Sequence, residues 1–118
     1  MAVEQNFIMF IGEDRDWQFT VVDSAGNPQN MGGWAMECIM RIAPVAVTAV
    51  FTKTTGAGEI AFSNSADGTN DRATVKVIDD DTVDLVPRKY SYTLRRTDAG
   101  NEVVIAYGEV DLQRRDTR

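Results

Sequence analysis

The sequence contains no histidine, and it has a single cysteine among its 118 residues. Histidine is the usual base that activates a catalytic thiol or hydroxyl, so the common nucleophilic dyads and triads have no base here. Cys38 cannot form an internal disulfide, and its position between Met36 and Met40 in an apolar stretch predicts a buried, unreactive thiol. We therefore expect that the protein is not an enzyme.

Basic residues and long apolar runs are also scarce. The chain has 12 Lys and Arg against 18 Asp and Glu, a formal net charge of −6. Proteins that bind nucleic acid carry clustered basic residues, so we expect no nucleic-acid partner. No stretch approaches the roughly 18 apolar residues that span a bilayer, and the N-terminus lacks the basic and apolar segments of a secretory signal. We expect no membrane partner and folding in a cytoplasm.

What the sequence does have is a regular alternation of apolar and polar residues. Two segments, residues 12–40 and 86–114, each contain an aromatic alternating strand, a polar turn with Asp and Gly, and a second alternating strand. Short strands recur every 8 to 12 residues or so, as in two-layer β proteins. The predicted fold class is all-β: an antiparallel β-sandwich, Ig-like, with seven to eight short strands and at most one helical turn. We expect one domain over residues 1–118, with an N-terminal arm or strand at 1–11 and a charged tail at 114–118.

The phase of the alternation predicts which side chains face the core. The expected core residues are Trp17, Phe19, Trp34, Met36, Tyr90, Tyr92 and Leu94. The segment at 78–87 is the one weak helical candidate, where Asp81 or Thr82 could cap a single turn that places Leu85 on the core.

Two acidic groups could carry chemistry. Consecutive aspartates at 79–81, with Asp84, could bind Ca²⁺, but they lack the alternating spacing of a calcium loop. Glu13, Asp14 and Asp16 could serve a hydrolase, yet a solvated strand edge explains them as well. We expect no metal, no cofactor and no catalytic residue at either group.

Apolar residues that the alternation turns outward are the candidates for contact with another protein. The N-terminal run from Phe7 to Ile11 could add to the sheet of a neighbouring subunit or pair within its own sheet, and the turn from Asp23 to Gly33 is a second adhesive element. The candidate protein–protein contact residues are Phe7, Met9, Ile11, Asn27, Met31 and Ile39.

The order of these segments resembles a family of phage virion proteins. Members open with a strand, D-x-x-G-x-P turn and G-W strand, here GEDRDWQFTVVDSAGNPQNMGGWAM, and close with segments that here read DDTVDLVP, YSYTL and TDAGNEVVIAYGEVDL. The chain is similar in this respect to the N-terminal domain of phage baseplate upper proteins and to small Ig-like proteins of phage tail-gene clusters. One departure is Arg88 after Pro87, where members have Gly.

The resemblance implies a non-enzymatic structural protein of a bacteriophage virion, assembled in the host cytoplasm. It implies a tail, baseplate or fibre adaptor that contacts other virion proteins and forms a homo-oligomer, a trimer by the family's usual symmetry. Larger members continue into a receptor-binding region, so a chain that stops at Arg118 suits an adaptor. Capsid decoration of a phage head and a small carbohydrate-binding module, which would use exposed aromatics, remain as alternatives.

Overall fold

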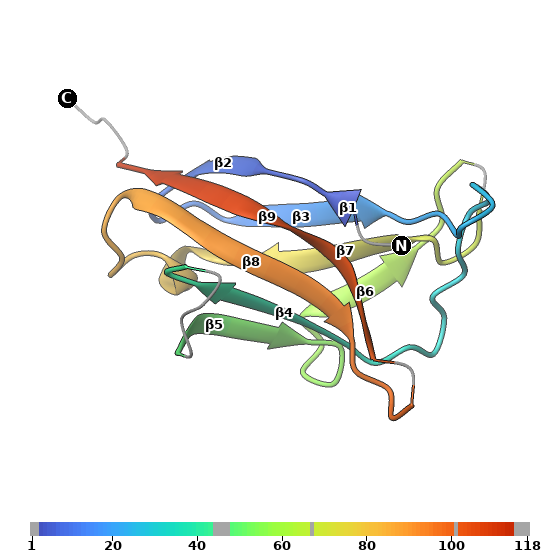
Figure 1. Cartoon of the computed structure of the whole chain (residues 1–118). Coiled ribbons are helices and arrows are strands. Elements are labelled where there is room, and N and C mark those ends of the chain that lie inside the picture. Colours follow the sequence, from blue (N-terminus) through green and yellow to red (C-terminus); the bar gives the residue numbers. More distant parts are fainter. Residues whose placement is uncertain (1–2, 44–47, 67, 101, 115–118) are drawn as a thin grey trace.

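The structure is a computed structural model that describes residues 3–43, 48–66, 68–100 and 102–114. Within these residues it is all-β, with one turn of 3-10 helix at Asp79–Asp81 (Figure 1). The strands are β1 (Val3–Glu4), β2 (Phe7–Phe10), β3 (Arg15–Thr20), β4 (Met36–Arg41), β5 (Ala49–Thr54), β6 (Ile60–Ser63), β7 (Arg72–Val77), β8 (Arg88–Arg96) and β9 (Val103–Gln113).

The strands form two sheets. The large sheet has the order β1-β9-β8-β4-β5, with β2 continuing the line of β1 along β9, and the small sheet has the order β3-β7-β6. Side chains from both sheets meet in one hydrophobic core, so the arrangement is sandwich-like (Figure 1). If β1 and β2 are taken as one interrupted strand, the described residues hold eight strands, within the predicted range.

The prediction of a purely antiparallel sheet was wrong at the N-terminus. β1 and β2 pair with β9 in parallel, with Val3 opposite Ala106 and Phe7 opposite Val110. The remaining ladders are antiparallel. The first and last strands of the chain are therefore neighbours, and the N-terminal run pairs within its own sheet.

The alternation of the sequence places the core as predicted in most strands. The core side chains include Trp17 and Phe19 of β3, the inward residues of β4, and Tyr90, Tyr92 and Leu94 of β8. Period-2 alternation lets one face of each strand meet the other sheet while the opposite face stays in water. Trp34 differs from the prediction because it precedes β4 and is only half-buried, with its ring 4.0 Å from the guanidinium of Arg96.

An aromatic cluster joins the two sheets and the N-terminal strand. The ring of Trp17 stacks on Phe7 with 5.0 Å between centroids, and it lies 5.3 Å from Tyr92 and 5.9 Å from Phe51. Phe19 contacts both Phe7 and Tyr92. Trp17 is fully buried, and its Nε1 is the one buried side-chain polar atom without a hydrogen-bond partner among the described residues.

The break between β1 and β2 is fixed by close backbone contacts. The hydroxyl of Tyr92 donates a short hydrogen bond to the carbonyl of Gln5, whose N–H donates to the carbonyl of Tyr107 at 2.9 Å. The side chain of Asn6 accepts from the N–H of Glu109 at 2.9 Å. A Cβ on Gly108 would lie 2.2 Å from the Gln5 carbonyl oxygen, so this site of β9 has room only for glycine.

The weak helical candidate is confirmed as a single turn, with Leu85 packed against the core. The predicted N-terminal cap was wrong, because the turn begins after Ile78 and Asp81 is its last residue. Residues 44–47, which precede β5, lie outside the described residues, as does the predicted tail after Arg114. Gly100 has a φ of +82°, as the predicted hairpin turn requires.

We expect Trp17→Ala to lower the free energy of unfolding by about 3–5 kcal/mol, the usual cost of truncating a buried aromatic residue. Trp17→Phe should cost less, since it keeps a ring in the cluster and removes the unpaired N–H. Denaturant titration of both variants measures this. An unchanged midpoint for Trp17→Ala would contradict the packing described here.

We expect Gly108→Ala to lower the free energy of unfolding by about 1–3 kcal/mol, because the added methyl overlaps the Gln5 carbonyl and must displace β1. Gly56→Ala is the matched control, since a Cβ there meets nothing within 4 Å. Denaturant titration compares the two variants, and equal stabilities would show that the N-terminal strand is not fixed against β9.

Candidate interaction surfaces

The outer face of the large sheet carries an ordered array of polar and apolar side chains. One row across the strands is Glu4, Tyr107, Thr93, Ile39 and Thr52. The next row contains Glu109, Ser91 and Arg41. A shallow hollow of about 520 Å³ lies over these rows, lined by residues of both. Tyr107 of β9 and Phe10 of β2, at 45% and 43% exposure, are large aromatic side chains on this face.

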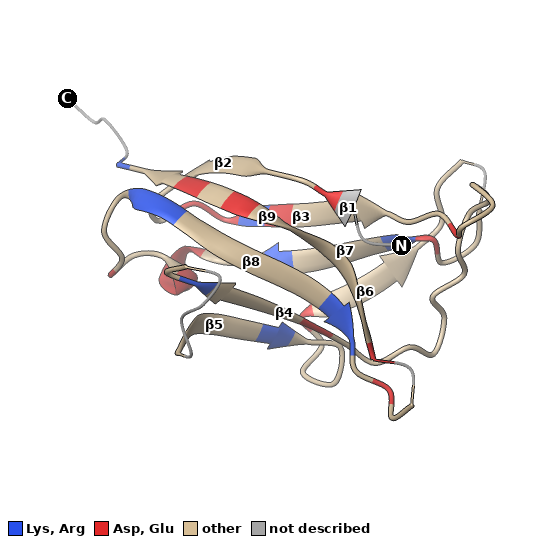
Figure 2. Cartoon of the chain, in the orientation of Figure 1, with Lys and Arg blue, Asp and Glu red and all other residues tan. Residues whose placement is uncertain are grey.

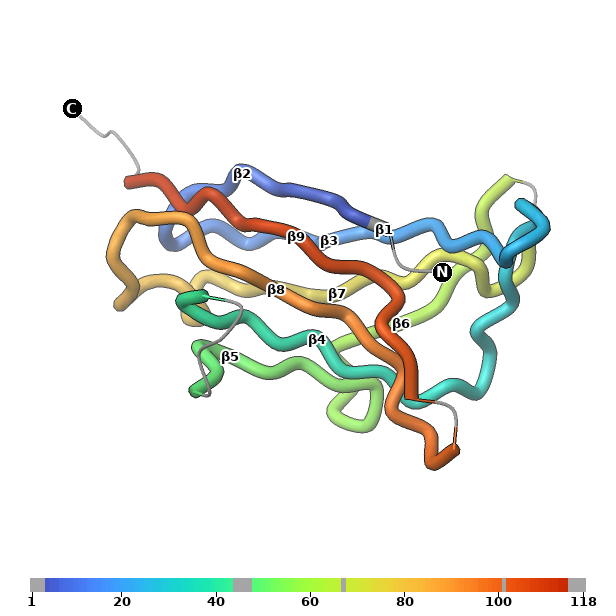
Figure 3. Tube along the Cα trace, viewed as in Figure 1, coloured from blue at the N-terminus to red at the C-terminus, as the bar shows by residue number. Residues whose placement is uncertain are grey.

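One end of the molecule is apolar. The end where β2 and β9 stop and β8 begins lies on the left of Figure 3, where the loop between β7 and β8 also lies. A hollow of about 330 Å³ there is lined by Ile11, Val83, Leu85, Val86, Pro87 and Arg114, and we call it the apolar end hollow. Val83 and Val86 are 54% and 63% exposed. Phe10, Ile42 and Ile78 are further exposed apolar residues of the segments that meet at this end.

The gap between the edges of β2 and β3 is closed by side chains. The guanidinium of Arg15 donates to the carbonyl of Ile8 at 2.9 Å, and the amide of Gln5 donates to the carbonyl of Gln18 at 3.0 Å. Both carbonyls are therefore already occupied. Another chain that added a strand here would have to break these hydrogen bonds.

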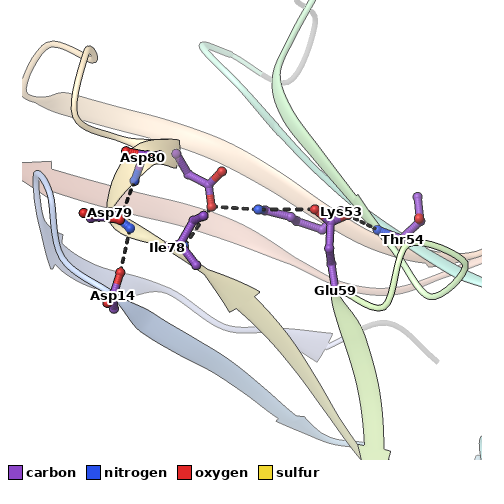
Figure 4. A network of polar contacts seen from close by, with 8 residues as sticks. Asp14, Lys53, Thr54, Glu59, Ile78, Asp79 and Asp80 are labelled. Atoms are coloured by element: carbon purple, nitrogen blue, oxygen red, sulfur yellow. Dashed lines mark hydrogen bonds and ion pairs between the residues drawn. The ribbon is translucent and has the colours of Figure 1, made fainter.

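The opposite edge, β5, carries a buried charge. Lys53 points inward and is only 5% exposed, and its Nζ lies 2.7 Å from Asp81 Oδ2 and 3.6 Å from Glu59 Oε2 (Figure 4). Glu59 also accepts from the N–H of Thr54 at 3.2 Å. The charge of Lys53 is thus compensated by two carboxylates, and the ion pair with Asp81 ties β5 to the turn after β7.

The acidic groups act as caps in this network. Asp81 accepts from the N–H of Ile78 at 2.8 Å, and Asp14 accepts from the N–H of Asp79 at 2.7 Å (Figure 4). Glu13 accepts from the N–H of Phe10 at 3.0 Å. These carboxylates fix the turns on which they lie. Among the described residues, no group of three or more His, Cys, Asp and Glu side chains is arranged to hold a metal ion.

The far end of the molecule contains polar turns held by hydrogen bonds, beside the exposed side chains of Val22, Val103 and Val104. Asp23 organises the turn that contains Asn27, accepting from its N–H at 3.0 Å. Asp71 accepts from the backbone N–H of Ser65 at 2.9 Å and from its hydroxyl at 2.6 Å, and these two bonds hold the pKa of Asp71 below its ordinary value. The hydrogen bond from Ala35 N–H is the main reason that the pKa of Asp98 is lowered as well.

The structure places the six predicted contact residues in different parts of the molecule. Met9 and Met31 are buried in the core, so their assignment as surface contacts was wrong. Phe7 is half-buried and stacks on Trp17, which also makes it a core residue. The phase of β2 is the reverse of the predicted one: Ile8 and Phe10 face outward.

The other three predicted residues reach a surface. Ile39 is half-buried on the outer face of the large sheet, and Ile11 lines the apolar end hollow. Asn27 is exposed in its turn at the polar end. The predicted set therefore falls on three different parts of the molecule and forms no single site.

Sequence reasoning missed Arg41, Tyr107 and Glu109 on the outer face and Val83 and Val86 at the apolar end. A signal existed for β9, because Tyr107 and Glu109 alternate with Val110 and Leu112, which are buried. No comparable signal existed for Val83 and Val86, because they lie in a loop where apolar and polar residues do not alternate regularly.

Comparisons with known proteins found no relative. No protein-family model matches the chain, and no curated protein matches it. Among the described residues there is also no helix long and apolar enough to cross a membrane.

We expect the protein to lose stability as the pH rises from about 9 to about 12. Burial raises the pKa of the Cys38 thiol from 9.0 to about 12, and burial also raises the pKa of Tyr92. The unfolded chain then releases protons at a lower pH than the folded chain, so alkali favours unfolding above about pH 9. Cys38→Ala should show a smaller loss over the same interval in denaturant titrations. An equal loss in both proteins would contradict this assignment.

Proposed function

We propose that this chain is a non-enzymatic, Ig-like interaction domain that joins other proteins in a larger assembly. In the narrower form of the proposal the assembly is a bacteriophage virion, put together in the host cytoplasm, and the domain is an adaptor of the tail, baseplate or fibre. The observation that carries the proposal is the apolar end hollow with its exposed valines.

The order of the strands supports the Ig-like assignment. The strands of variable-type Ig domains are lettered from A to G. The last strand, G, lies between strand F and an N-terminal strand, in a sheet that also contains strands C and C′. Here β9, β8, β4 and β5 take the places of G, F, C and C′, and β3, β7 and β6 take those of B, E and D. The parallel pairing of β2 with β9 fits the same scheme.

A tyrosine at the start of β8 adds a second point of agreement. Ig domains have a tyrosine near the start of strand F whose hydroxyl bonds to the backbone a few residues upstream. Tyr90 Oη donates to the carbonyl of Val86 at 2.8 Å. Two residues later, where antibody domains have a cysteine, this chain has Tyr92, whose ring contacts with Trp17 and Phe19 take the place of the disulfide between the sheets.

The apolar end hollow suits a docking site. Val83 and Val86 are among the most exposed large apolar side chains of the described residues, and they border a concave surface. Exposed apolar surface of this kind is uncommon on proteins that act alone and marks contact with a partner. Carboxylates on the flanking turns, Glu13 and Asp84, favour a partner whose own apolar surface is bordered by basic residues.

The virion part of the proposal rests on the resemblance of the segments DWQFTVVDSAGNP, YSYTL and TDAGNEVVIAYGEV to phage baseplate and tail proteins. An antibody against the purified chain tests it on virions purified from the phage that encodes the sequence. Label on the tail supports an adaptor, and label on the head supports capsid decoration. Virions without the chain would remove the virion proposal while leaving the interaction domain open.

We expect Val83→Asp and Val86→Asp to abolish attachment of the purified chain to virions or tails that lack it, measured by co-sedimentation. A carboxylate in the hollow must lose its hydration when a partner covers it. Both positions are more than half exposed, so the thermal midpoint should stay close to that of the unmodified protein. Val103→Asp, at 45% exposure on the opposite end, is the matched control. Attachment that survives both substitutions would place the docking site elsewhere.

A further inference from the structure

Strand addition at the seam between β2 and β3 would break hydrogen bonds, because Arg15 and Gln5 already donate to backbone carbonyls there. The predicted edge-strand pairing between subunits would have to disrupt these contacts. The faces of the sheets and the edges at β5 and β6 remain as surfaces for self-association. Of the two outer faces, that of the large sheet has more strands and carries the hollow of about 520 Å³.

The centre of this face is uncharged. Tyr107, Thr93 and Ile39 lie side by side on β9, β8 and β4. Interfaces between proteins are depleted of charge at their centre and enriched in tyrosine. The composition of this row is therefore typical of the centre of a contact surface.

Charges of opposite sign flank the centre on different strands. The β9 side carries Glu109 and Asp111, with Glu4 beyond them on β1, and the β4 side carries Arg41. Figure 2 shows the acidic residues along β9 and β1 and basic residues at both ends of β8. Arg95 on β8 is already paired with Glu37 of β4, with 3.2 Å between Nε and Oε1.

The registers place Arg41 and Glu109 in one row, on either side of Ser91 of β8. Two strand spacings separate them, about 9.6 Å, which is too far for a direct ion pair within the chain. A rotation by 180° about an axis that runs parallel to β8 exchanges the β9 side with the β4 side. Glu109 of each copy then faces Arg41 of the other copy, and Tyr107 of each copy faces Ile39 of the other. Both pairs therefore occur twice.

We propose that the outer face of the large sheet binds the same face of a second copy, about a two-fold axis parallel to β8. This contact is isologous, so each favourable pair occurs twice. A two-fold axis perpendicular to the strands would place β9 on β9 and β4 on β4, so the acidic strand would face its own copy. The charges therefore select the axis parallel to β8. Lys89 and Arg95 of β8 each approach their own copy near this axis, and Asp111 beside Lys89 and Glu37 beside Arg95 compensate the repulsion.

The size of the face sets the strength of the contact. Five strands about 4.8 Å apart and six residues of about 3.4 Å each cover about 500 Å² per copy, or about 1,000 Å² in total. This area is at the lower limit for a specific interface, so the dimer is weak and depends on protein concentration. The inference goes beyond the docking of the apolar end, because it uses another surface, and either can fail without the other.

Sedimentation equilibrium up to about 1 mM protein at low ionic strength tests the contact. We expect a monomer–dimer equilibrium that weakens as salt is added. Arg41→Glu and Glu109→Arg should each weaken dimerisation by at least about tenfold, because each creates two like-charge contacts. Arg72→Glu, on the small sheet, is the matched control and should leave the dimer unchanged.

A mixture of the two variants distinguishes this contact between copies from an effect of either substitution within its own chain. In an equimolar mixture of Arg41→Glu and Glu109→Arg, every cross-copy pair is again of opposite charge, so the mixture should associate although neither variant does alone. The double variant should also dimerise. Thermal midpoints show whether each variant is folded. A protein that stays monomeric at the highest concentration, a trimer, or variants that dimerise equally well alone and mixed would each overturn the proposal.

Discussion

The contact on which the rest of this structure depends is the meeting of Tyr92 with Trp17 and Phe7. Tyr92 lies on the large sheet, Trp17 on the small sheet and Phe7 on the N-terminal strand, so three parts of the chain share one aromatic cluster. The Tyr92 hydroxyl also holds the Gln5 carbonyl, for which Gly108 leaves room. Here ring packing joins the sheets in a chain whose single cysteine cannot form an internal disulfide.

The cluster also fixes the position of the N-terminal strand. It draws the N-terminal strand onto β9 of its own chain, and Arg15 then closes the seam beside it. Lys53 of β5 forms an ion pair with Asp81, which ties this edge to the turn after β7. The two surfaces that we propose for contact are the outer face of the large sheet and the apolar end hollow, where Val86 remains exposed.

Much of the fold was predictable, and the candidate surfaces were predictable only in part. Strands with one face in water alternate in sequence, so β3, β4 and β8 and their core residues were identified correctly. The run from Phe7 to Ile11 has no polar residue to set its phase, and the prediction turned Met9 outward when Ile8 and Phe10 face solvent. Met31 was misassigned for a similar reason, because it lies in a turn, where no regular alternation of apolar and polar residues shows which side chains are buried.

The sequence by itself determined the all-β class, the core of the alternating strands and the unreactive environment of Cys38, because these depend on local period and composition. The tertiary structure alone decided the parallel pairing of the first and last strands and the row that holds Arg41 and Glu109. Residues 41 and 109 belong to strands separated by most of the chain. Their common row follows from the register of both strands against β8, and no local pattern encodes that register.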